Sequence, residues 1–368
     1  MKKNKICIIA GTRPELIRLS LIIKKLEQFF EVILVHTGQN YTVSLNDIFF
    51  KELNIKKPDY QIDLYTSDFG KQIGDMFTQV NKILLKEQPS KVLILGDTNS
   101  GLCSIIAEKL KIPVFHMEAG NRSFNASVPE EINRKLIDSI SSYNLPYTER
   151  SKENLLKDGI PKERIFVTGN PIYEVIEHFK ENIESSTILN EFNLKPKNYF
   201  LATFHRAENV DNVDNLISIL EGLSRIGLEF NKQVICSVHP RTQSKIKEFN
   251  IIPNKEVLKF CQPFGFFDFI KLEKNCTAVL SDSGTISEDA CILRVPNIIL
   301  RTATERVEVI ETGGSILAGI KSDDIIRATN FMLKSDLNWK IPEEYMCHNV
   351  SDKICSILLS KYEWVEKR

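Results

Sequence analysis

The sequence of 368 residues carries 48 basic and 48 acidic side chains, so its formal net charge is zero. A neutral chain of this length suits two ordinary domains and offers no net field to nucleic acid or to an acidic membrane surface, so we expect a small, locally bound anionic ligand. Its apolar runs fall short of the about 18 residues that a membrane span needs, and the run from Ile6 to Ala10 is too short for a secretory segment, which leads us to expect a soluble, cytoplasmic protein.

In the first half of the chain, short apolar runs alternate with amphipathic segments. The runs and the segments that follow them are Lys5 to Ala10 with Pro14 to Phe30, Val32 to His36 with Tyr41 to Leu53, Lys91 to Asp97 with Asn99 to Lys111, and Val114 to Glu118 with Pro129 to Ile140. A strand pattern followed by a helix pattern predicts βα units, and therefore a parallel sheet covered by helices.

The interval from Lys180 to Asn198 is polar and lacks a strong apolar run, so we interpret it as a linker between domains. The strand pattern then returns at Tyr199 to His205, Gln233 to His239, Val257 to Gln262, Ala278 to Ser283 and Asn297 to Arg301. We therefore predict an α/β chain with two Rossmann-like, doubly wound domains, residues 1–170 and 171–350, followed by a segment 351–368 with helical spacing.

Polar clusters follow the expected strands in both halves of the chain. In chain order they are Gly11 to Glu15, Gly38 to Asn40, Gly96 to Asn99, His116 to Arg122, His205 with Arg206, His239 to Arg241, and Asp282 to Thr285. Open α/β sheets bind ligands beyond the carboxyl ends of their strands, so we expect both domains to direct these edges at one cleft.

The stretch from Phe115 to Asp138 is unusually rich in charge. It places Glu118, Glu130 and Glu131 around a short polar turn, together with three cationic side chains and one histidine. Burying an ionised group without a partner costs several kcal/mol or shifts its pKa until it is neutral, so a core segment has no use for so many charges. We interpret the stretch as a reaction site.

A second site is expected where the strand pattern ending at Ser283 gives way to a helix pattern, because backbone N–H groups at the start of a helix bind anions. The candidate diphosphate contacts are Ser283, Gly284 and Thr285, and the candidate ribose contacts are Glu288 and Asp289. An ordinary helix cap explains the same residues. A second turn, from Gly11 to Pro14, favours a phosphate-binding site over a simple helix cap, because Arg13 can donate two parallel hydrogen bonds to phosphate oxygens.

Four phenylalanines lie between Phe264 and Phe269. We expect one of them, Phe269, to stack on a nucleotide base, although such a cluster is also typical of a hydrophobic core. The eight cysteines are scattered singly without metal-ligand spacing, and no GxGxxG motif is present, so we expect neither a metal nor a nicotinamide cofactor.

Nine short motifs stand in order along the chain: GTRPELIR (11–18), GQN (38–40), GDTNS (96–100), HMEAG (116–120), PEEINR (129–134), TGNPI (168–172), HRAEN (205–209), SDSGTISED (281–289) and TERVE (304–308). With them the chain resembles, nearly from end to end, the NAD-independent, non-hydrolysing UDP-N-acetylglucosamine 2-epimerase family. The resemblance implies the GT-B fold, in which two Rossmann-like domains flank an active-site cleft and a C-terminal helix packs back on the first domain. It also implies a homodimer.

The resemblance further implies epimerisation at C2, in which UDP is eliminated to give a 2-acetamidoglycal and then adds back with the proton delivered to the opposite face. By the same resemblance Asp97, Glu118 and Glu130 are the acid/base carboxylates, and His205 supports the departure of UDP. The other candidates for holding a UDP-N-acetylhexosamine substrate are Arg13, Arg18, Gln39, Arg122, Arg134, His239, Phe269, Ser283, Gly284, Thr285, Glu288, Asp289 and Arg306. Arg18 stands where commoner members have lysine.

Each of these residue types also has an ordinary structural explanation. Asp97 suits the N-cap of a helix, Glu130 complements the dipole of a first helical turn, and His205 suits the end of a strand. Glu131 and Arg134 lie three residues apart on the expected helix, a spacing at which an acid and a base often form only a surface pair.

Several positions bear on the substrate. Asn40, Asn121, the segment Thr98 to Ser100 and the short loop 123–128 resemble the branch that converts UDP-2-acetamido-2,6-dideoxy-L-talose to UDP-N-acetyl-L-fucosamine for capsule or O-antigen sugars. The alternatives are a UDP-GlcNAc/UDP-ManNAc 2-epimerase, a hydrolysing epimerase, a GT-B glycosyltransferase and a non-catalytic UDP-sugar sensor. Lys71 stands where regulated enzymes carry a glutamine, so we do not expect an allosteric UDP-GlcNAc site.

Overall fold

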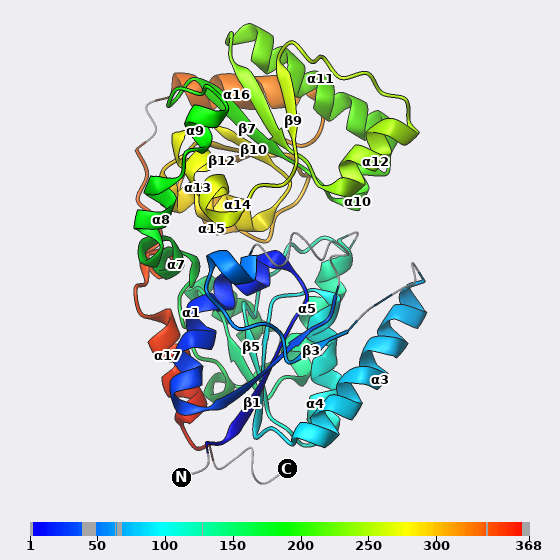
Figure 1. Ribbon diagram of the computed structural model, residues 1–368, viewed down its shortest axis with the longest axis vertical. Coiled ribbons are helices and arrows are strands. Elements are labelled where there is room, and N and C mark those ends of the chain that lie inside the picture. Colours follow the sequence, from blue (N-terminus) through cyan, green and yellow to red (C-terminus); the bar gives the residue numbers. More distant parts are fainter. Residues whose placement is uncertain are drawn as a thin grey trace. The chain divides into compact units, whose positions relative to one another are not determined.

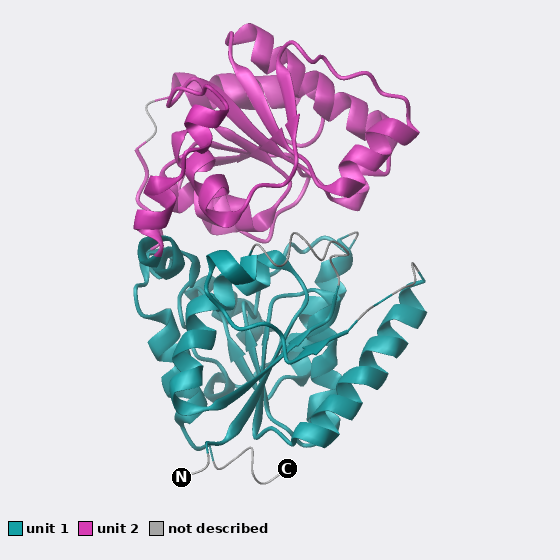
Figure 2. Cartoon of the chain, in the orientation of Figure 1, with its two compact units in different colours: residues 1–178, 343–368 teal, residues 179–342 magenta. Residues whose placement is uncertain are grey.

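The computed structural model describes residues 3–38, 49–62, 64, 68–126, 128–335 and 338–362 of the chain. The chain divides into two compact units, shown in different colours in Figure 2. Unit 1 consists of Met1–His178 and Glu343–Arg368, and unit 2 consists of Phe179–Pro342. The chain therefore leaves unit 1 once and returns to it at its C-terminal end.

Unit 1 contains a parallel sheet of six described strands (Figure 1). They are β1 (Lys5–Ala10), β2 (Glu31–His36), β3 (Tyr60–Gln61), β4 (Lys91–Leu95), β5 (Val114–Met117) and β6 (Tyr143–Leu145), in the spatial order β3-β2-β1-β4-β5-β6. β1 pairs with β2 on one side and with β4 on the other. The direction of chain progression reverses between β1 and β4, which makes this pair the topological switch point, where doubly wound sheets bind ligands.

The helices of unit 1 cover both faces of its sheet, which is why β1 reads as a continuous apolar run. They are α1 (Arg13–Phe29), α3 (Phe69–Glu87), α4 (Ser104–Lys109), α5 (Pro129–Ile140), α6 (Glu149–Lys157), α7 (Ile172–His178) and α17 (Val350–Leu359). On one face, Cys7 and Ile9 of β1 share a buried cluster with Val80 and Leu84 of α3. None of the helices in the described part of the chain is long and apolar enough to cross a membrane.

The C-terminal helix α17 belongs to unit 1, where it contacts α1. The ammonium group of Lys91, at the start of β4, donates to the carbonyl oxygens of Leu358 and Ser360 at the carboxyl end of α17. Lys25 of α1 and Asp352 of α17 form an ion pair of 2.5 Å. A cation at the carboxyl end of a helix also complements the helix dipole, so Lys91 fixes α17 against the sheet.

Unit 2 contains a second parallel sheet of six described strands. They are β7 (Tyr199–Thr203), β8 (Gln233–Ser237), β9 (Leu258–Cys261), β10 (Val279–Ser281), β11 (Asn297–Ile299) and β12 (Ser315–Leu317), in the order β12-β11-β10-β7-β8-β9. Counted from the first strand of the unit, this is the same winding as in unit 1. Its switch point lies between β7 and β10, which pair in parallel.

The helices of unit 2 pack on both faces of this sheet, as in unit 1. They are α8 (Lys180–Ser185), α9 (Ile188–Glu191), α10 (Ala207–Val210), α11 (Val213–Glu229), α12 (Pro240–Glu248), α13 (Phe266–Asn275), α14 (Gly284–Leu293), α15 (Val307–Glu311) and α16 (Ser322–Lys334). Phe200 of β7 shares a buried cluster with Leu223 of α11 and Ile325 of α16. Its neighbour Leu201 points to the opposite face and joins a cluster with Leu272 of α13.

The predicted α/β class with two doubly wound sheets is confirmed, and the predicted helix from Pro129 to Ile140 is found with the same bounds as α5. The interval from Lys180 to Asn198 differs from the predicted linker. It contains α8 and α9, which bury Ile183 and Ile188. Both helices are too short to show an amphipathic repeat over the roughly 11 to 18 residues in which such a repeat is recognised.

Candidate active site

The turns after β1 and β4 meet at the switch point of unit 1. Glu15, in the first turn of α1, is only 3% exposed and joins them. Its Oε2 accepts hydrogen bonds from the backbone N–H groups of Gly11 (2.6 Å) and Thr12 (3.1 Å), and its Oε1 accepts one from Thr98 Oγ1 (2.7 Å). Burial raises the pKa of Glu15 to about 7, although these hydrogen bonds favour the ionised form.

Sequence analysis placed Glu15 in a polar turn but assigned it no role. The signal for a role is the pair Thr12 and Glu15, which has the spacing of a helix capping box. The hydrogen bond to Thr98 carried no signal in the sequence, because it depends on β1 and β4 being neighbours in the sheet.

Asp97, the residue after Gly96 at the end of β4, is held by Arg134 of α5. Arg134 donates from Nε to Asp97 Oδ2 (2.7 Å) and from Nη1 to Glu131 Oε2 (2.9 Å). Glu131 also accepts from the N–H (3.0 Å) and hydroxyl (2.9 Å) of Ser123. Burial would raise the pKa of Glu131, but the hydrogen bonds from Ser123 and Arg134 outweigh it and lower the pKa below its ordinary value.

The surface pair that we considered for Glu131 and Arg134 is wrong for this chain. Arg134 is 3% exposed and Glu131 is 4% exposed, and the guanidinium bridges two carboxylates from different elements. The Asp97 side chain keeps 23% of its exposure, so it remains open to a ligand while one of its oxygens is fixed. An arrangement of this kind orients a carboxylate for chemistry.

Glu118 follows β5 with a backbone φ of +64°, a conformation that non-glycine residues seldom adopt and that costs about 1 kcal/mol or more. Its N–H donates to the carbonyl oxygen of Leu145 (3.1 Å), and its Oε1 accepts from Asn121 Nδ2 (3.4 Å). Asn121 in turn accepts from the Ser151 hydroxyl (3.0 Å). The half-buried carboxylate of Glu118 is therefore aimed by a strained turn.

A buried group of charges lies behind this turn. His116 Nδ1 is 2.8 Å from Asp138 Oδ1, and its Nε2 is 2.9 Å from the carbonyl oxygen of Gly96, next to the Asp97 turn. Arg122 Nη2 pairs at 2.7 Å with Asp138 Oδ2 and with Asp158 Oδ2. Burial alone would raise the pKa of Asp138, but His116 and Arg122 lower it below its ordinary value.

These contacts engage Arg122 inside unit 1, where it braces the turn that carries Glu118. A role for Arg122 in holding the substrate stays a prediction.

The remaining candidates of unit 1 lie on two helices and one segment. Arg13 is the first residue of α1, half-buried, with its guanidinium 5.6 Å from the ring centre of Phe49, and burial lowers its pKa. Arg18 lies one turn further along α1 and is buried. Glu130 is half-buried in the first turn of α5. Gln39 lies outside the described residues.

In unit 2, Asp282 after β10 joins the turn after β7. Asp282 is fully buried, and its carboxylate accepts from the backbone N–H groups of His205 (3.0 Å) and Arg206 (2.9 Å) and from Asn209 Nδ2 (3.0 Å). The His205 ring is 46% exposed, with Nδ1 3.4 Å from Asp282 Oδ1. Asp282 thus holds His205 at the switch point with its ring open to solvent. Sequence analysis named Asp282 as part of a polar cluster and gave it no role.

The amino end of α14 carries the candidate diphosphate contacts. Ser283 is its N-cap, and the hydroxyls of Ser283 and Thr285 lie 3.0 Å apart. Gly284 packs closely, since a Cβ at this position would lie 2.4 Å from Glu305 Oε1 and would force that side chain to shift. The helix therefore presents a backbone surface and two hydroxyls beside a buried carboxylate.

Buried ion pairs line the side of α14. Arg301 Nη2 pairs with Glu305 Oε2 at 2.9 Å, and Arg306 Nε pairs with Glu288 Oε1 at 2.5 Å. All four side chains are buried. Glu288 and Arg306, two predicted UDP contacts, are thus partners of one another, and Asp289 is buried beside Glu288. Arg301 and Glu305 had no predicted role.

Two further candidates of unit 2 occupy separate places. His239 caps α12 by accepting from the N–H of Arg241 (3.2 Å), and its ring centre is 6.1 Å from that of His205. Phe269 is half-buried and packs on the hydrophobic cluster beneath β7. The core explanation thus applies to part of the Phe269 side chain, and its stacking on a base stays a prediction.

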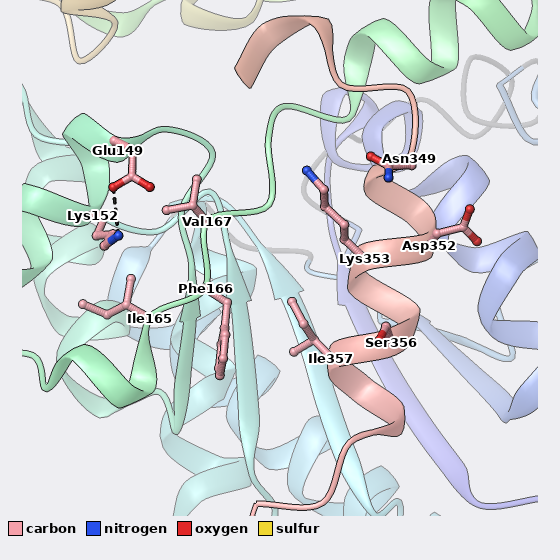
Figure 3. Close-up of a pocket in the computed structure, with 10 residues that line it drawn as sticks. All are labelled: Glu149, Lys152, Ile165, Phe166, Val167, Asn349, Asp352, Lys353, Ser356 and Ile357. Atoms are coloured by element: carbon pink, nitrogen blue, oxygen red, sulfur yellow. Dashed lines mark hydrogen bonds and ion pairs between the residues drawn. The ribbon is translucent and has the colours of Figure 1, made fainter. Parts of the chain in front are cut away.

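A pocket of about 590 Å³ lies elsewhere in unit 1, between α17, the start of α6 and the segment 165–167 (Figure 3). None of the predicted site residues lines it, and its charged side chains are already paired, for example Lys152 with Glu149 at 2.8 Å. Among the described residues, no group of three or more His, Cys, Asp or Glu side chains is arranged to hold a metal ion. The candidate chemistry therefore rests on the two switch points.

Comparison with known proteins identifies the family of the chain. A curated relative named UDP-N-acetylglucosamine 2-epimerase, from Methanocaldococcus jannaschii, is 44% identical over 346 residues, which cover 92% of this chain and 94% of the relative. A crystal structure of the M. jannaschii UDP-GlcNAc 2-epimerase in complex with UDP-GlcNAc and UDP matches with a TM-score of 0.91 and 43% identity, covering 96% of this chain and 99% of that chain.

The glycosyltransferase WaaG, involved in lipopolysaccharide biosynthesis, matches with a TM-score of 0.60 over 97% of this chain and 100% of that chain. At 9% identity this likeness concerns the fold alone. Together with the epimerase structure it supports the predicted GT-B-like fold.

The family described as UDP-N-acetylglucosamine 2-epimerase matches residues 24–359. That range contains both sheets apart from β1, together with all three candidate carboxylates. The chain therefore belongs to the UDP-N-acetylglucosamine 2-epimerase family and is an isomerase of that family.

Proposed function

We propose that this protein interconverts UDP-N-acetylglucosamine and UDP-N-acetylmannosamine by epimerisation at C2. The observation that carries the proposal is the 43% identity, over 96% of the chain, to an epimerase solved with UDP-GlcNAc and UDP. Asp97 at the switch point of unit 1, Glu118 and Glu130 after the next strand β5, and the helix N-terminus at the switch point of unit 2 are the groups that we propose for this chemistry.

In the proposed reaction, one carboxylate of unit 1 removes the C2 proton while the bond between C1 and the β-phosphate oxygen breaks, which leaves a 2-acetamidoglycal and UDP. UDP then adds back to C1, and a second carboxylate delivers a proton to the opposite face of C2. Asp97, Glu118 and Glu130 are the proposed acid/base groups. Arg134 supports Asp97 in this role, because its guanidinium fixes one carboxylate oxygen.

UDP is proposed to bind at the amino end of α14, where the N–H groups and the hydroxyls of Ser283 and Thr285 meet its phosphates. His205 and Arg13 stabilise the charge that develops on the departing diphosphate, and Arg13 offers two parallel donors for this purpose. The proposed residues that position the rest of the nucleotide are Arg18, Gln39, Arg122, His239, Phe269, Gly284, Glu288, Asp289 and Arg306.

This assignment divides the labour between the proposed domains. Residues 1–170 supply the acid/base carboxylates, residues 171–350 hold UDP, and residues 351–368 pack on the first domain. We further propose that the protein acts in the cytoplasm as a homodimer, and that its product serves the synthesis of a capsule or O-antigen. No metal or nicotinamide is required by the proposed reaction.

The comparisons favour UDP-GlcNAc over the UDP-N-acetyl-L-fucosamine branch that the sequence suggested, because two relatives that match over 92% of the chain, at 44% and 41% identity, carry the name UDP-N-acetylglucosamine 2-epimerase. Asn121 was one mark of that branch. In the structure it accepts from Ser151 and donates to Glu118. Asn40, a second mark, lies outside the described residues.

The test is an NMR assay in deuterium oxide with UDP-GlcNAc, UDP-ManNAc and UDP-2-acetamido-2,6-dideoxy-L-talose in separate samples. We expect the first two to interconvert with uptake of deuterium at C2. Conversion of the talose derivative alone would restore the fucosamine reading. Release of free N-acetylmannosamine would identify a hydrolysing enzyme, and sugar transfer without deuterium uptake would identify a glycosyltransferase.

Glu118→Gln tests the assignment of the carboxylates. The substitution removes the basic group but keeps the shape, so we expect kcat to fall by about 10²-fold or more. The matched control is Glu149→Gln, because Glu149 is a carboxylate of unit 1 whose side chain is 61% exposed. Equal activity of the two variants would remove Glu118 from the mechanism.

A further inference from the structure

Each switch point is crossed by one buried carboxylate. Asp282 joins the turns after β10 and β7 in unit 2, and Glu15 joins the turns after β1 and β4 in unit 1. Neither residue is among the proposed acid/base groups. The bond of Glu15 to Thr98 spans 83 residues of sequence, and Thr98 is the immediate neighbour of Asp97.

Helix capping explains only part of the environment of Glu15. A capping-box glutamate satisfies the N–H of the N-cap residue, which here is Thr12. The second oxygen of such a glutamate accepts no hydrogen bond from the helix backbone. In Glu15 that oxygen accepts the Thr98 hydroxyl at 2.7 Å inside the protein, and the first oxygen also accepts from Gly11 at 2.6 Å.

Asp97 is therefore held from two directions. Arg134 fixes its carboxylate at 2.7 Å, and Asn133 Nδ2 donates to its backbone carbonyl at 2.9 Å, both from α5. The bond between Thr98 and Glu15 fixes the same turn to the start of α1, where Arg13 stands. That bond is a direct side-chain link between the Asp97 turn and the turn of Arg13, in addition to the pairing of β1 with β4.

We infer that Glu15 is a positioning residue of the epimerase, which acts through Thr98 to set the Asp97 carboxylate relative to the turn that carries Arg13. The inference rests on the proposed function, since it assigns Glu15 a part in that reaction. Proton transfer and departure of the diphosphate belong to one step, so the two groups that assist them need a fixed spacing. Misplacement by about 1 Å is enough to slow such a step by as much as 10²-fold.

The decisive variant is Thr98→Val, which removes the hydroxyl and keeps the branched shape. We expect kcat to fall by about tenfold while KM changes by less than about twofold, because the substrate still binds but reacts from a poorer geometry. Thr98→Ser retains the hydroxyl and should restore kcat to within about threefold of wild type. Unchanged kcat in Thr98→Val would overturn the inference.

Glu15→Gln provides a second variant that should fold. Its amide oxygen accepts from Gly11 and Thr12, and its amide nitrogen donates to the Thr98 hydroxyl, so the link survives without the charge. We expect kcat within about threefold of wild type. A loss as large as that of Thr98→Val would contradict positioning through this link.

The matched control is Thr329→Val in α16 of unit 2. Thr329 is buried, whereas Thr98 is half-buried, and the Thr329 hydroxyl donates to the carbonyl oxygen of Ile325 at 2.8 Å, remote in the chain from every proposed site residue. Its replacement deletes the same chemical group at a comparable cost in stability. We expect its kcat and KM to equal those of wild type.

Amide hydrogen exchange separates failure of the inference from failure of the proposed function. A wild-type protein that changes none of the UDP-sugars contradicts the proposed function. The coupling is then decided by exchange in peptides that cover residues 11–15 and 95–101. Faster exchange of both in Thr98→Val, with the control unchanged, supports the link, whereas unchanged exchange in both overturns it.

Discussion

Nε of Arg134 lies 2.7 Å from Oδ2 of Asp97, in a site where the arginine is almost fully buried. The same guanidinium reaches Glu131 through Nη1, so one rigid fork holds two carboxylates that are 34 residues apart in sequence. A planar guanidinium presents its donors in fixed directions, which a single ammonium group does not. The orientation of Asp97 therefore depends on arginine at position 134.

Arg134→Lys should lower kcat by about 10-fold to 100-fold, because lysine keeps the charge but cannot hold both carboxylates in the same geometry. Arg134→Met should in addition lower the unfolding free energy by about 3 kcal/mol, since it leaves the buried carboxylate of Glu131 without its cation. NMR kinetics and urea denaturation measure the two effects.

The control for this pair is Arg327→Met, which breaks an ion pair with Asp324 on the surface of α16. The Arg327 side chain is 77% exposed, so the unfolding free energy should change by less than about 1 kcal/mol. Similar losses in the two methionine variants would show that the buried bridge has no special role.

Glu15 should make stability depend on pH. Burial raises its pKa from 4.5 to about 7, so the folded state favours the protonated form. The resulting contribution to stability is fully present below pH 4.5 and is lost as the pH rises to about 7, a change of about 3 kcal/mol by the usual linkage. Glu15→Gln has no titrating group at this position, so its unfolding free energy should rise relative to that of wild type as the pH increases across this window.

Urea denaturation of both proteins at intervals between about pH 4.5 and pH 8 measures this difference. Other groups titrate in the same window, but they are common to both proteins and cancel in the comparison. A constant difference in unfolding free energy would mean that the pKa of Glu15 is the same in the folded and unfolded states.

Asp282→Asn should damage the turn that carries His205. Oδ2 accepts from two backbone N–H groups and one side-chain amide, and an asparagine can keep these bonds with its amide oxygen. Its amide nitrogen then replaces Oδ1 and places a donor against the N–H of His205 (3.2 Å). We expect a loss of about 1 to 3 kcal/mol in unfolding free energy and a lower kcat. The control is Asp214→Asn, an exposed change in the first turn of α11. It should change the unfolding free energy by less than about 0.5 kcal/mol and leave kcat unaltered.

Gly284→Ala should weaken the binding of UDP. The added methyl group would lie 2.4 Å from Glu305 Oε1, so the pair of Glu305 and Arg301 must move away from the start of α14. We expect the Kd for UDP to rise about tenfold, which corresponds to about 1.4 kcal/mol, and titration calorimetry measures it.

Gly74→Ala is the matched control, because a methyl group there meets no atom within 4 Å and α3 should become more stable by about 0.5 to 1 kcal/mol. Unchanged UDP affinity in Gly284→Ala would mean that UDP does not approach this backbone.

The sequence was sufficient to predict the strands that carry the site, because β1, β4, β7 and β10 are apolar runs that end in polar turns. It also predicted the helix that carries Glu130 and Glu131, since its proline and acidic first turn mark its start. The neighbour relations were not predictable in the same way. The contacts of Arg134 with Asp97 and of Asp282 with His205 depend on which strands are adjacent in the sheet, and the period of a pattern does not specify this.

Burial was the second property that the sequence did not reveal. Glu131 and Arg134 have the spacing of a solvent-exposed pair, and the sequence does not show the packing of α5 against α4 and against the 3-10 turn Asn99–Cys103 that follows β4. The assignment of a substrate branch rested on a residue with the same ambiguity. Asn121 was read as a mark of specificity, whereas its contacts with Glu118 and Ser151 place it in the scaffold of the turn.

The left-handed backbone at Glu118 sets a limit on how this protein can be made more robust. Glycine adopts a φ of +64° at no steric cost, so Glu118→Gly should raise the melting temperature while removing a proposed catalytic group. Selection for heat resistance alone would favour that exchange. A screen for thermal stability alone would therefore select thermostable but inactive variants substituted at residue 118, so such a screen must be combined with an assay of turnover.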